Sequence, residues 1–276
     1  IQAIEERDPS DDARGGAYLA RAMALRALNR PDEANADIQR AQDLHPNDPA
    51  PIVEGAQVLM NDYDFEGARR LLSRPVVEKF PLLIALRAEA LAHLKDRDGA
   101  KRDIDEALRR LNDAYEPNSV RMAAADAAME LGDVNLAERT LAAVSGPSAA
   151  TARHAIVRGR LAFAKRDPAA MIEAFHDAAT REEKFRAAAY GELGSRLYAM
   201  KKFAEAVDAF RRSDPLPDRL KEQYVRALGA ANQIVDANGL IEEELQKGPS
   251  APDWALELAA HIADARDDRE AAVRHL

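Results

Sequence analysis

Histidine and carboxylate side chains are the groups in this sequence that could bind a metal or transfer a proton. The histidines lack ligand spacing and fall at unrelated phases of the repeat described below: His45, His93, His154, His176, His261 and His275. Neighbouring acids, such as Asp11 with Asp12 or the run Glu242 to Glu244, point about 100° apart on a helix and do not converge on one cation. We interpret both sets as surface or boundary residues, and we predict no metal.

Local signatures of enzymes are also missing. The sequence has no HExxH, no GxSxG, no Gly-rich loop followed by Lys and Ser or Thr, and no GxGxxG after a strand. The lack of cysteine excludes disulfides and thiolate metal sites, and it suits a cytoplasm or a bacterial periplasm equally. We therefore predict no enzymatic activity and no cofactor, and we leave these two compartments open.

Composition and charge narrow the class of protein. Hydrophobic residues make up 47% of the chain but aromatic residues only 5%, so Ala and Leu, the best helix formers, dominate and an all-α fold is expected. The 48 acidic and 39 basic residues give a net charge of −9, and the basic residues are not clustered, which argues against nucleic acid as a partner. Because no apolar run reaches the roughly 18 residues of a membrane span, no membrane insertion is predicted.

The elements that would position functional side chains recur along the chain. A helix with a small residue near its middle is followed by a turn and by a second helix that opens on Ala, with Met once in its place. The equivalent second-helix residues lie 31 to 37 residues apart: Ala34, Ala68, Ala100, Ala137, Met171, Ala206, Ala237 and Ala271. A repeat near 34 residues indicates stacked helix pairs. We predict turns near Asn29–Asp32, Asn61–Tyr63, Lys95–Asp98, Leu131–Asp133, Lys165–Asp167, Met200–Lys202 and Arg266–Asp268.

Residues at fixed offsets from these positions predict the packing. Twelve residues upstream the side chain is small except at Val225: Ala22, Ala56, Ala88, Ala125, Gly159, Gly194, Val225 and Ala259. Four residues downstream it is large until His275 breaks the series: Ile38, Leu72, Ile104, Leu141, Phe175, Phe210 and Ile241. Small residues allow two helices to approach closely, and the large ones fill the space between neighbouring pairs.

On these residues the chain resembles the tetratricopeptide repeat family. The first unit has that family's pattern in Tyr18, Ala22, Leu25, Ala34, Ile38, Ala41 and Pro46, and the sixth unit has it in Tyr190, Leu193, Gly194, Leu197, Ala206 and Phe210. The sequence departs from it at Pro75, in a longer third unit before Pro117, and in the register of the seventh unit. The resemblance implies one domain, a right-handed superhelical solenoid of about eight antiparallel helix pairs. Its repeats would cover residues 15–48, 49–80, 81–117, 118–151, 152–186, 187–217, 218–251 and, truncated, 252–276.

In this family one stripe of each first helix faces a concave groove that binds a peptide or helix of another protein. We call its counterpart here the groove stripe. It comprises Met23, Arg26, Gln57, Met60, Asn61, Glu89, His93, Met122, Asp126, Met129, Arg160, Phe163, Ser195 and Tyr198. Methionine suits a surface that accepts an apolar partner, although the same residues could simply fill gaps between helix pairs. A clamp for a peptide's terminal carboxylate is disfavoured, because Leu19, Met23, Val53 and Gln57 stand where Lys and Asn would be needed.

The leading functional hypothesis is a protein–protein interaction scaffold, from a bacterial-looking protein, whose partner lies in the groove. One alternative is a purely structural spacer, or an element that self-associates through its end repeats. Another is the sensor or substrate-recruiting arm of a larger enzyme or export machine. The chain starts at Ile1 and stops at Leu276 within an expected helix, so a fragment of a longer protein is expected.

Overall fold

A computed structural model describes residues 11–27, 30–61 and 63–265 of the chain, which contain helices and no strand. The all-α class and the helical solenoid predicted from the sequence are confirmed. The chain divides into two compact units, Ile1–Ala149 and Ala150–Leu276.

The elements of both units are short helices. The first unit holds α2 (Asp11–Ala27), α3 (Pro31–Leu44), α4 (Pro49–Asn61), α5 (Phe65–Leu71), α6 (Pro81–His93), α7 (Arg97–Arg109), α8 (Pro117–Glu130) and α9 (Val134–Ala142). The second holds α10 (Ala152–Ala164), α11 (Pro168–Arg181), α12 (Glu183–Ala199), α13 (Phe203–Arg212), α14 (Asp218–Ala230), α15 (Ile234–Leu245) and α16 (Asp253–Ala265). Four 3₁₀ helices follow second helices: η1 (Pro75–Lys79), η2 (Leu111–Asp113), η3 (Gly146–Ala150) and η4 (Gly248–Ser250).

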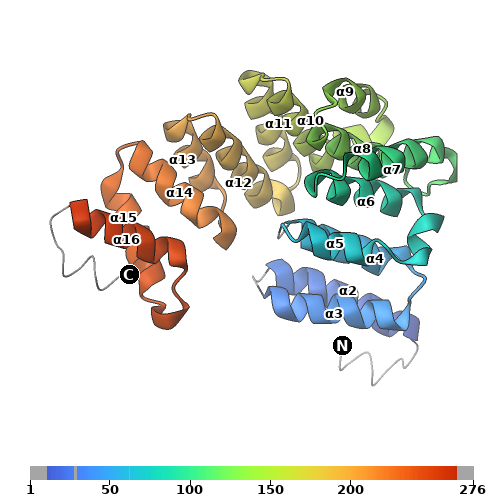
Figure 1. The fold of residues 1–276 in the computed structure, drawn as a ribbon, viewed down its shortest axis with the longest axis horizontal. Helices are drawn as coiled ribbons and strands as arrows, with labels where there is room; N and C mark the ends of the chain where they lie inside the picture. Colours follow the sequence, from blue (N-terminus) through green and yellow to red (C-terminus); the bar gives the residue numbers. More distant parts are fainter. Residues whose placement is uncertain (1–10, 28–29, 62, 266–276) are drawn as a thin grey trace. The chain divides into compact units, whose positions relative to one another are not determined.

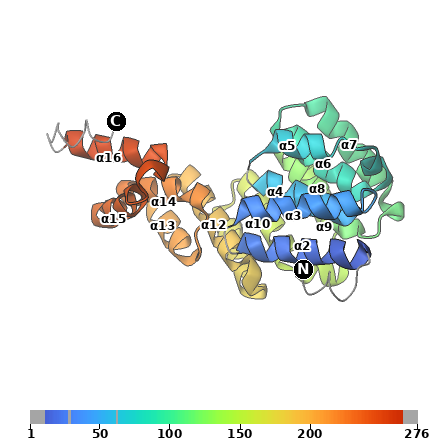
Figure 2. The same ribbon diagram turned by 90° about the horizontal axis from the view of Figure 1, so that it is seen from below.

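Consecutive helices form antiparallel pairs, beginning with α2 and α3 and ending with α14 and α15, and α16 follows as a further first helix. Within each unit the two helices of a pair lie side by side in both views (Figures 1 and 2). Neighbouring first helices also contact each other, most extensively α6 and α8. The first helices α4, α6 and α8 therefore make a continuous layer in the first unit, and α10, α12 and α14 make one in the second.

The turns inside the six pairs from α4–α5 to α14–α15 share one geometry. One residue takes a left-handed conformation, and its N–H donates to the carbonyl three residues back. The next N–H donates to the carbonyl five residues back, which completes the Schellman motif that ends many helices. The left-handed residues are Tyr63, Lys95, Gly132, Arg166, Lys201 and Asn232. Their spacing repeats the period read from the sequence.

Five of these six left-handed residues lie within the predicted turns. The predicted turn at Lys95–Asp98 runs slightly too far, because α7 already begins at Arg97. The turn at Asn232 was not predicted, because the seventh unit departs from the repeat pattern and its register was left open. Asn29 and the predicted turn at 266–268 lie outside the described residues.

Aspartate caps start several second helices. The carboxylates of Asp64, Asp96, Asp133 and Asp167 each accept a hydrogen bond from the backbone N–H three residues on. These N–H groups would otherwise lack a partner within the helix, so the cap fixes where the helix begins. The sequence thus encodes these four turns twice, by a residue that ends the first helix and by one that starts the second.

The small and large positions face each other within a pair. A Cβ added to Gly159 would lie 2.7 Å from the ring of Phe175, and one added to Gly194 would lie 2.6 Å from the ring of Phe210. Where the second helix carries Leu or Ile instead, as at Leu72, the first helix has room for Ala. The pair shares a nearly constant volume, and the two Phe positions require glycine.

Two of the three departures from the repeat pattern are visible as 3₁₀ helices. Pro75 cannot continue a helix, so α5 ends early at Leu71 and η1 follows. The longer third unit places η2 between α7 and α8. Both insertions follow a second helix, so the first-helix layer that carries the groove stripe is kept.

Candidate binding faces

The first unit carries the groove stripe on α4, α6 and α8, which are neighbours in the first-helix layer. Gln57 and Met60 on α4 are half-buried and Asn61 is exposed. Met129 on α8 is half-buried. The side chains of Met23 and Arg26 lie outside the described residues.

Three groove-stripe residues are buried, although accessible side chains were expected at these positions. Glu89 is 9% exposed, Met122 7% and Asp126 3%, so the expectation of an accessible side chain is wrong for them. The physical reason is the close packing of α6 against α8, which covers the side chains that face the neighbouring first helix. In this part of the stripe the accessible side chains are those near the turns.

His93, near one of these turns, contacts the repeat before it and the repeat after it. Its ring stacks on Phe65 with centroids 3.9 Å apart and planes 13° from parallel. Its Nδ1 lies 3.4 Å from the carboxylate of Glu130, the last residue of α8. Tyr63 stands edge-on to Phe65 with centroids 6.0 Å apart. His93 was predicted from the sequence as a groove-stripe residue, but Phe65 and Tyr63 were not predicted as site residues. An aromatic pair at a predicted turn could have indicated them.

In the second unit Arg160 and Phe163 of α10 meet α12, the helix that also carries Ser195 and Tyr198. Arg160 donates from Nε and Nη2 to the carboxylate of Glu192 at 2.7 and 2.9 Å. Arg196 donates to the same carboxylate at 2.7 Å and lies 4.8 Å from the centroid of the Phe163 ring. Tyr198 is half-buried, edge-on to Phe203. Ser195, also half-buried, precedes Arg196 on α12.

The electrostatics of this cluster depend on Glu192. Burial on its own would raise the pKa of this carboxyl, but the charges of Arg160 and Arg196 outweigh it and lower the pKa to about 2. All three side chains keep 23% exposure, so water still reaches the cluster. Glu192 and Arg196 were missed from the sequence because Glu192 lies 32 residues from Arg160, and only helix packing pairs them.

The four histidines with described side chains, His45, His93, His154 and His176, are half-buried. His176 shares a hydrogen bond of 3.2 Å with the Tyr190 hydroxyl, and burial together with Arg212 lowers its pKa. In the described part of the chain no group of three His, Cys, Asp or Glu side chains could hold a metal ion. None of the helices described is long and apolar enough to cross a membrane.

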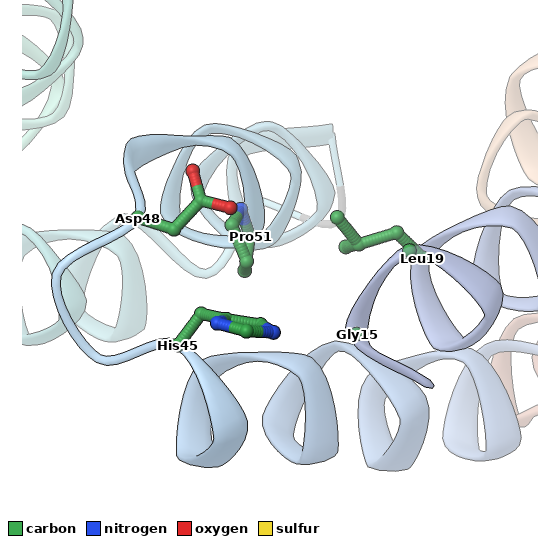
Figure 3. A pocket seen from close by; sticks show the side chains of 6 residues that line it. Gly15, Leu19, His45, Asp48 and Pro51 are labelled. Carbon is green, nitrogen blue, oxygen red and sulfur yellow. The ribbon is translucent and has the colours of Figure 1, made fainter. Parts of the chain in front are cut away.

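A pocket of about 220 Å³ lies between α2 and the α3–α4 connection (Figure 3). Gly15 and Leu19 of α2 face His45, Asp48 and Pro51 across it. The imidazole approaches Gly15 so closely that no larger side chain fits there. Ligand pockets are typically about 300 to 1,000 Å³ with several convergent polar groups, so this pocket is smaller than a typical ligand site.

The repeating turns, the paired helices and the small-to-large contacts define the fold as a tetratricopeptide-type helical repeat. The chain is similar in structure to a chain of the APC/C hetero-tetramer Cut9-Hcn1, with a TM-score of 0.52 and 19% identity. That match covers 92% of this chain and 50% of the other, so the chain spans about half the length of that protein. At this identity the likeness concerns the fold alone.

Two further solved structures are similar at lower TM-scores. A tetratricopeptide repeat protein from Parabacteroides merdae has a TM-score of 0.36 and 12% identity, over 95% of this chain and 90% of its own. The P58(IPK) TPR domain has a TM-score of 0.34 and 15% identity, over 95% and 81%. No family model and no curated protein sequence matches the chain.

Proposed function

We propose that this chain is a protein–protein interaction scaffold that binds a peptide or helix of a partner on its first-helix layer. The observation that carries the proposal is that half-buried polar and apolar side chains lie on first helices of the same unit. In the first unit these are Gln57, Met60 and Met129, and in the second they are Phe163, Ser195 and Tyr198. Such a surface offers apolar area for affinity and polar groups for orientation.

The proposal includes no reaction and no bound cofactor. Glu192 is held by two arginines and His93 by a stacked ring and a carboxylate, and these contacts orient side chains without providing a nucleophile beside a base. A stoichiometric transition metal in elemental analysis of the purified protein would contradict this part.

The experiment uses peptides selected from a random 12-residue library on the full chain, with their affinities measured one by one. The test variant carries Met60→Glu with Met129→Glu, because these side chains reach the surface whereas Met122 does not. We expect at least a tenfold loss of affinity at unchanged helical content. The matched control adds the same charge to exposed positions of second helices, Ala36→Glu with Asn135→Glu, and should bind as the wild type does.

Unchanged affinity at unchanged helicity in the test variant would mean that the partner binds elsewhere. It would favour the alternatives of a structural spacer, self-association through the end repeats, or the recruiting arm of a larger enzyme or export machine.

A further inference from the structure

An aromatic surface lies at the turn edge of the first unit, where α4 meets α5 and α6 meets α7. We call it the turn-edge patch and define it as Tyr63, Phe65, His93 and Leu94. Tyr63 is 60% exposed and Leu94 37% exposed. The Phe65 ring stacks on His93 and meets the edge of Tyr63, so three rings from two repeats lie in contact.

The backbone at Tyr63 is costly for its side chain. Its φ of 61° is left-handed, a conformation that bulky residues rarely adopt. The other described turns of this type carry Lys95, Gly132, Arg166, Lys201 and Asn232 at this position, which are flexible, small or tolerant residues. A large ring held in an unfavourable conformation and open to water is better explained by binding than by folding.

Charge indicates the kind of partner. The first unit has 27 acidic and 19 basic residues, a net −8, whereas the second has 21 and 20, a net −1. In and beside the two turns that carry the patch, Asp64, Asp96 and Asp98 are exposed acids and Lys95 and Arg97 are exposed bases, and Glu130 lies beside His93. The Arg97 guanidinium donates to the carbonyl of Leu131. The patch therefore lies in a negative environment.

We propose that the turn-edge patch binds a cationic segment of a partner protein, with an arginine or lysine over the Tyr63 ring and an adjacent apolar residue against Leu94. A cation is attracted to an aromatic face, and the surrounding carboxylates strengthen this attraction at low salt. The proposal rests on the proposed function only in that the partner is a protein. The patch lies at the ends of the helices and shares only His93 with the groove stripe, which runs along them.

The probes are three fluorescent 12-residue peptides that differ in one residue type. One carries three arginine–leucine pairs separated by glycine and serine, the second has citrulline in place of arginine, and the third has glutamate. Binding to the full chain is measured by fluorescence anisotropy at low salt. We expect the arginine peptide to bind at least tenfold more tightly than the citrulline peptide, and the glutamate peptide to bind most weakly.

Variants then locate the site. Tyr63→Ala should weaken the arginine peptide by about threefold to fivefold, the range for an exposed cation–π contact. Tyr63→Phe should retain binding, and Tyr63→Gly keeps the turn conformation while removing the ring. The matched control is Tyr115→Ala, since Tyr115 is 98% exposed in the same unit but follows the opposite end of α7.

Equal losses in the Tyr63→Ala and Tyr115→Ala variants, or equal affinities for the arginine and citrulline peptides, would overturn the proposal. The first result would mean diffuse attraction to an acidic protein, and the second would mean apolar binding alone. The variant with Met60→Glu and Met129→Glu keeps the aromatic rings, so its effect on library peptides tests the groove stripe separately from the patch.

Discussion

At Gly194 the packing of the helix pair leaves no space for even a Cβ atom. The Phe210 ring lies where a Cβ at Gly194 would be, so the first helix can approach the second only without a side chain there. By contrast, Gly229 on α14 is surrounded by open space. The same residue type therefore has opposite roles in two neighbouring repeats.

Gly194→Ala should lower the free energy of unfolding by about 1 to 3 kcal/mol, because overpacking forces the ring or the helix to move. Gly229→Ala should raise it by up to about 1 kcal/mol, because alanine favours a helix. Adding Phe210→Leu to Gly194→Ala should recover part of the loss, since it recreates the Ala56 and Leu72 combination. Urea unfolding followed by circular dichroism measures all three, and equal effects at both glycines would refute the packing argument.

Glu192 gives a prediction for pH. Its pKa is lowered to about 2 from an ordinary value of 4.5, so its ionised form stabilises the folded state above about pH 4.5. That contribution should decline as the pH falls from 4.5 toward 2. The difference in free energy of unfolding between the wild type and Glu192→Gln should therefore shrink over this range. A difference that is constant from pH 7 to pH 3 would show that the charge of Glu192 is not involved.

At the scale of elements, the turns and caps decide where each helix begins and ends. Asp96 precedes α7, and its carboxylate accepts from the Gly99 N–H at 2.9 Å. Lys202 and Gln233 hold the same position before α13 and α15 without a side-chain cap. The second helices therefore differ in how firmly their first turn is held.

Asp96→Ala should cost about 1 kcal/mol of stability, the usual value of an N-cap. Asp105→Ala is the matched control, because Asp105 lies exposed within the same helix and its substitution removes the same charge. Hydrogen exchange of the first-turn amides of α7 should quicken only in the Asp96 variant. Equal destabilisation by both substitutions would point to net charge and not to capping.

For the whole molecule, stability should be shared between neighbouring pairs. Each pair buries one face on the next, so a change in one repeat is felt most by its neighbours. In the second unit the buried cluster runs from Ala152 to Ile241 and includes both Phe175 and Phe210. Loosening one pair should weaken the pairs beside it.

Gly194→Ala should thus accelerate amide exchange in α10 to α15, with the largest increase in α12 and α13. Amides of α4 and α6, several repeats away along the chain, should change least. Hydrogen exchange with mass spectrometry resolves these segments. A uniform increase over both units would show that the chain unfolds as one cooperative body.

Much of the fold could be predicted from the sequence because its determinants are local. The left-handed turn residue, the Asp cap and the small and large residues recur at fixed spacing, and each acts within one helix pair. The asparagine turn of the seventh repeat was missed because the first helix of that repeat fits the pattern poorly, with Val225 at the small position, which left its register open.

The candidate site depended on tertiary packing. The sequence placed Glu89, Met122 and Asp126 on the groove stripe, but only the approach of α6 to α8 decided that they are buried. In the same way, Arg160 meets Glu192 and Phe65 meets His93 across neighbouring repeats. A repeat period predicts which face of its own helix a residue occupies. It does not state how closely the next helix approaches that face, because this distance is set by the side chains of both helices together.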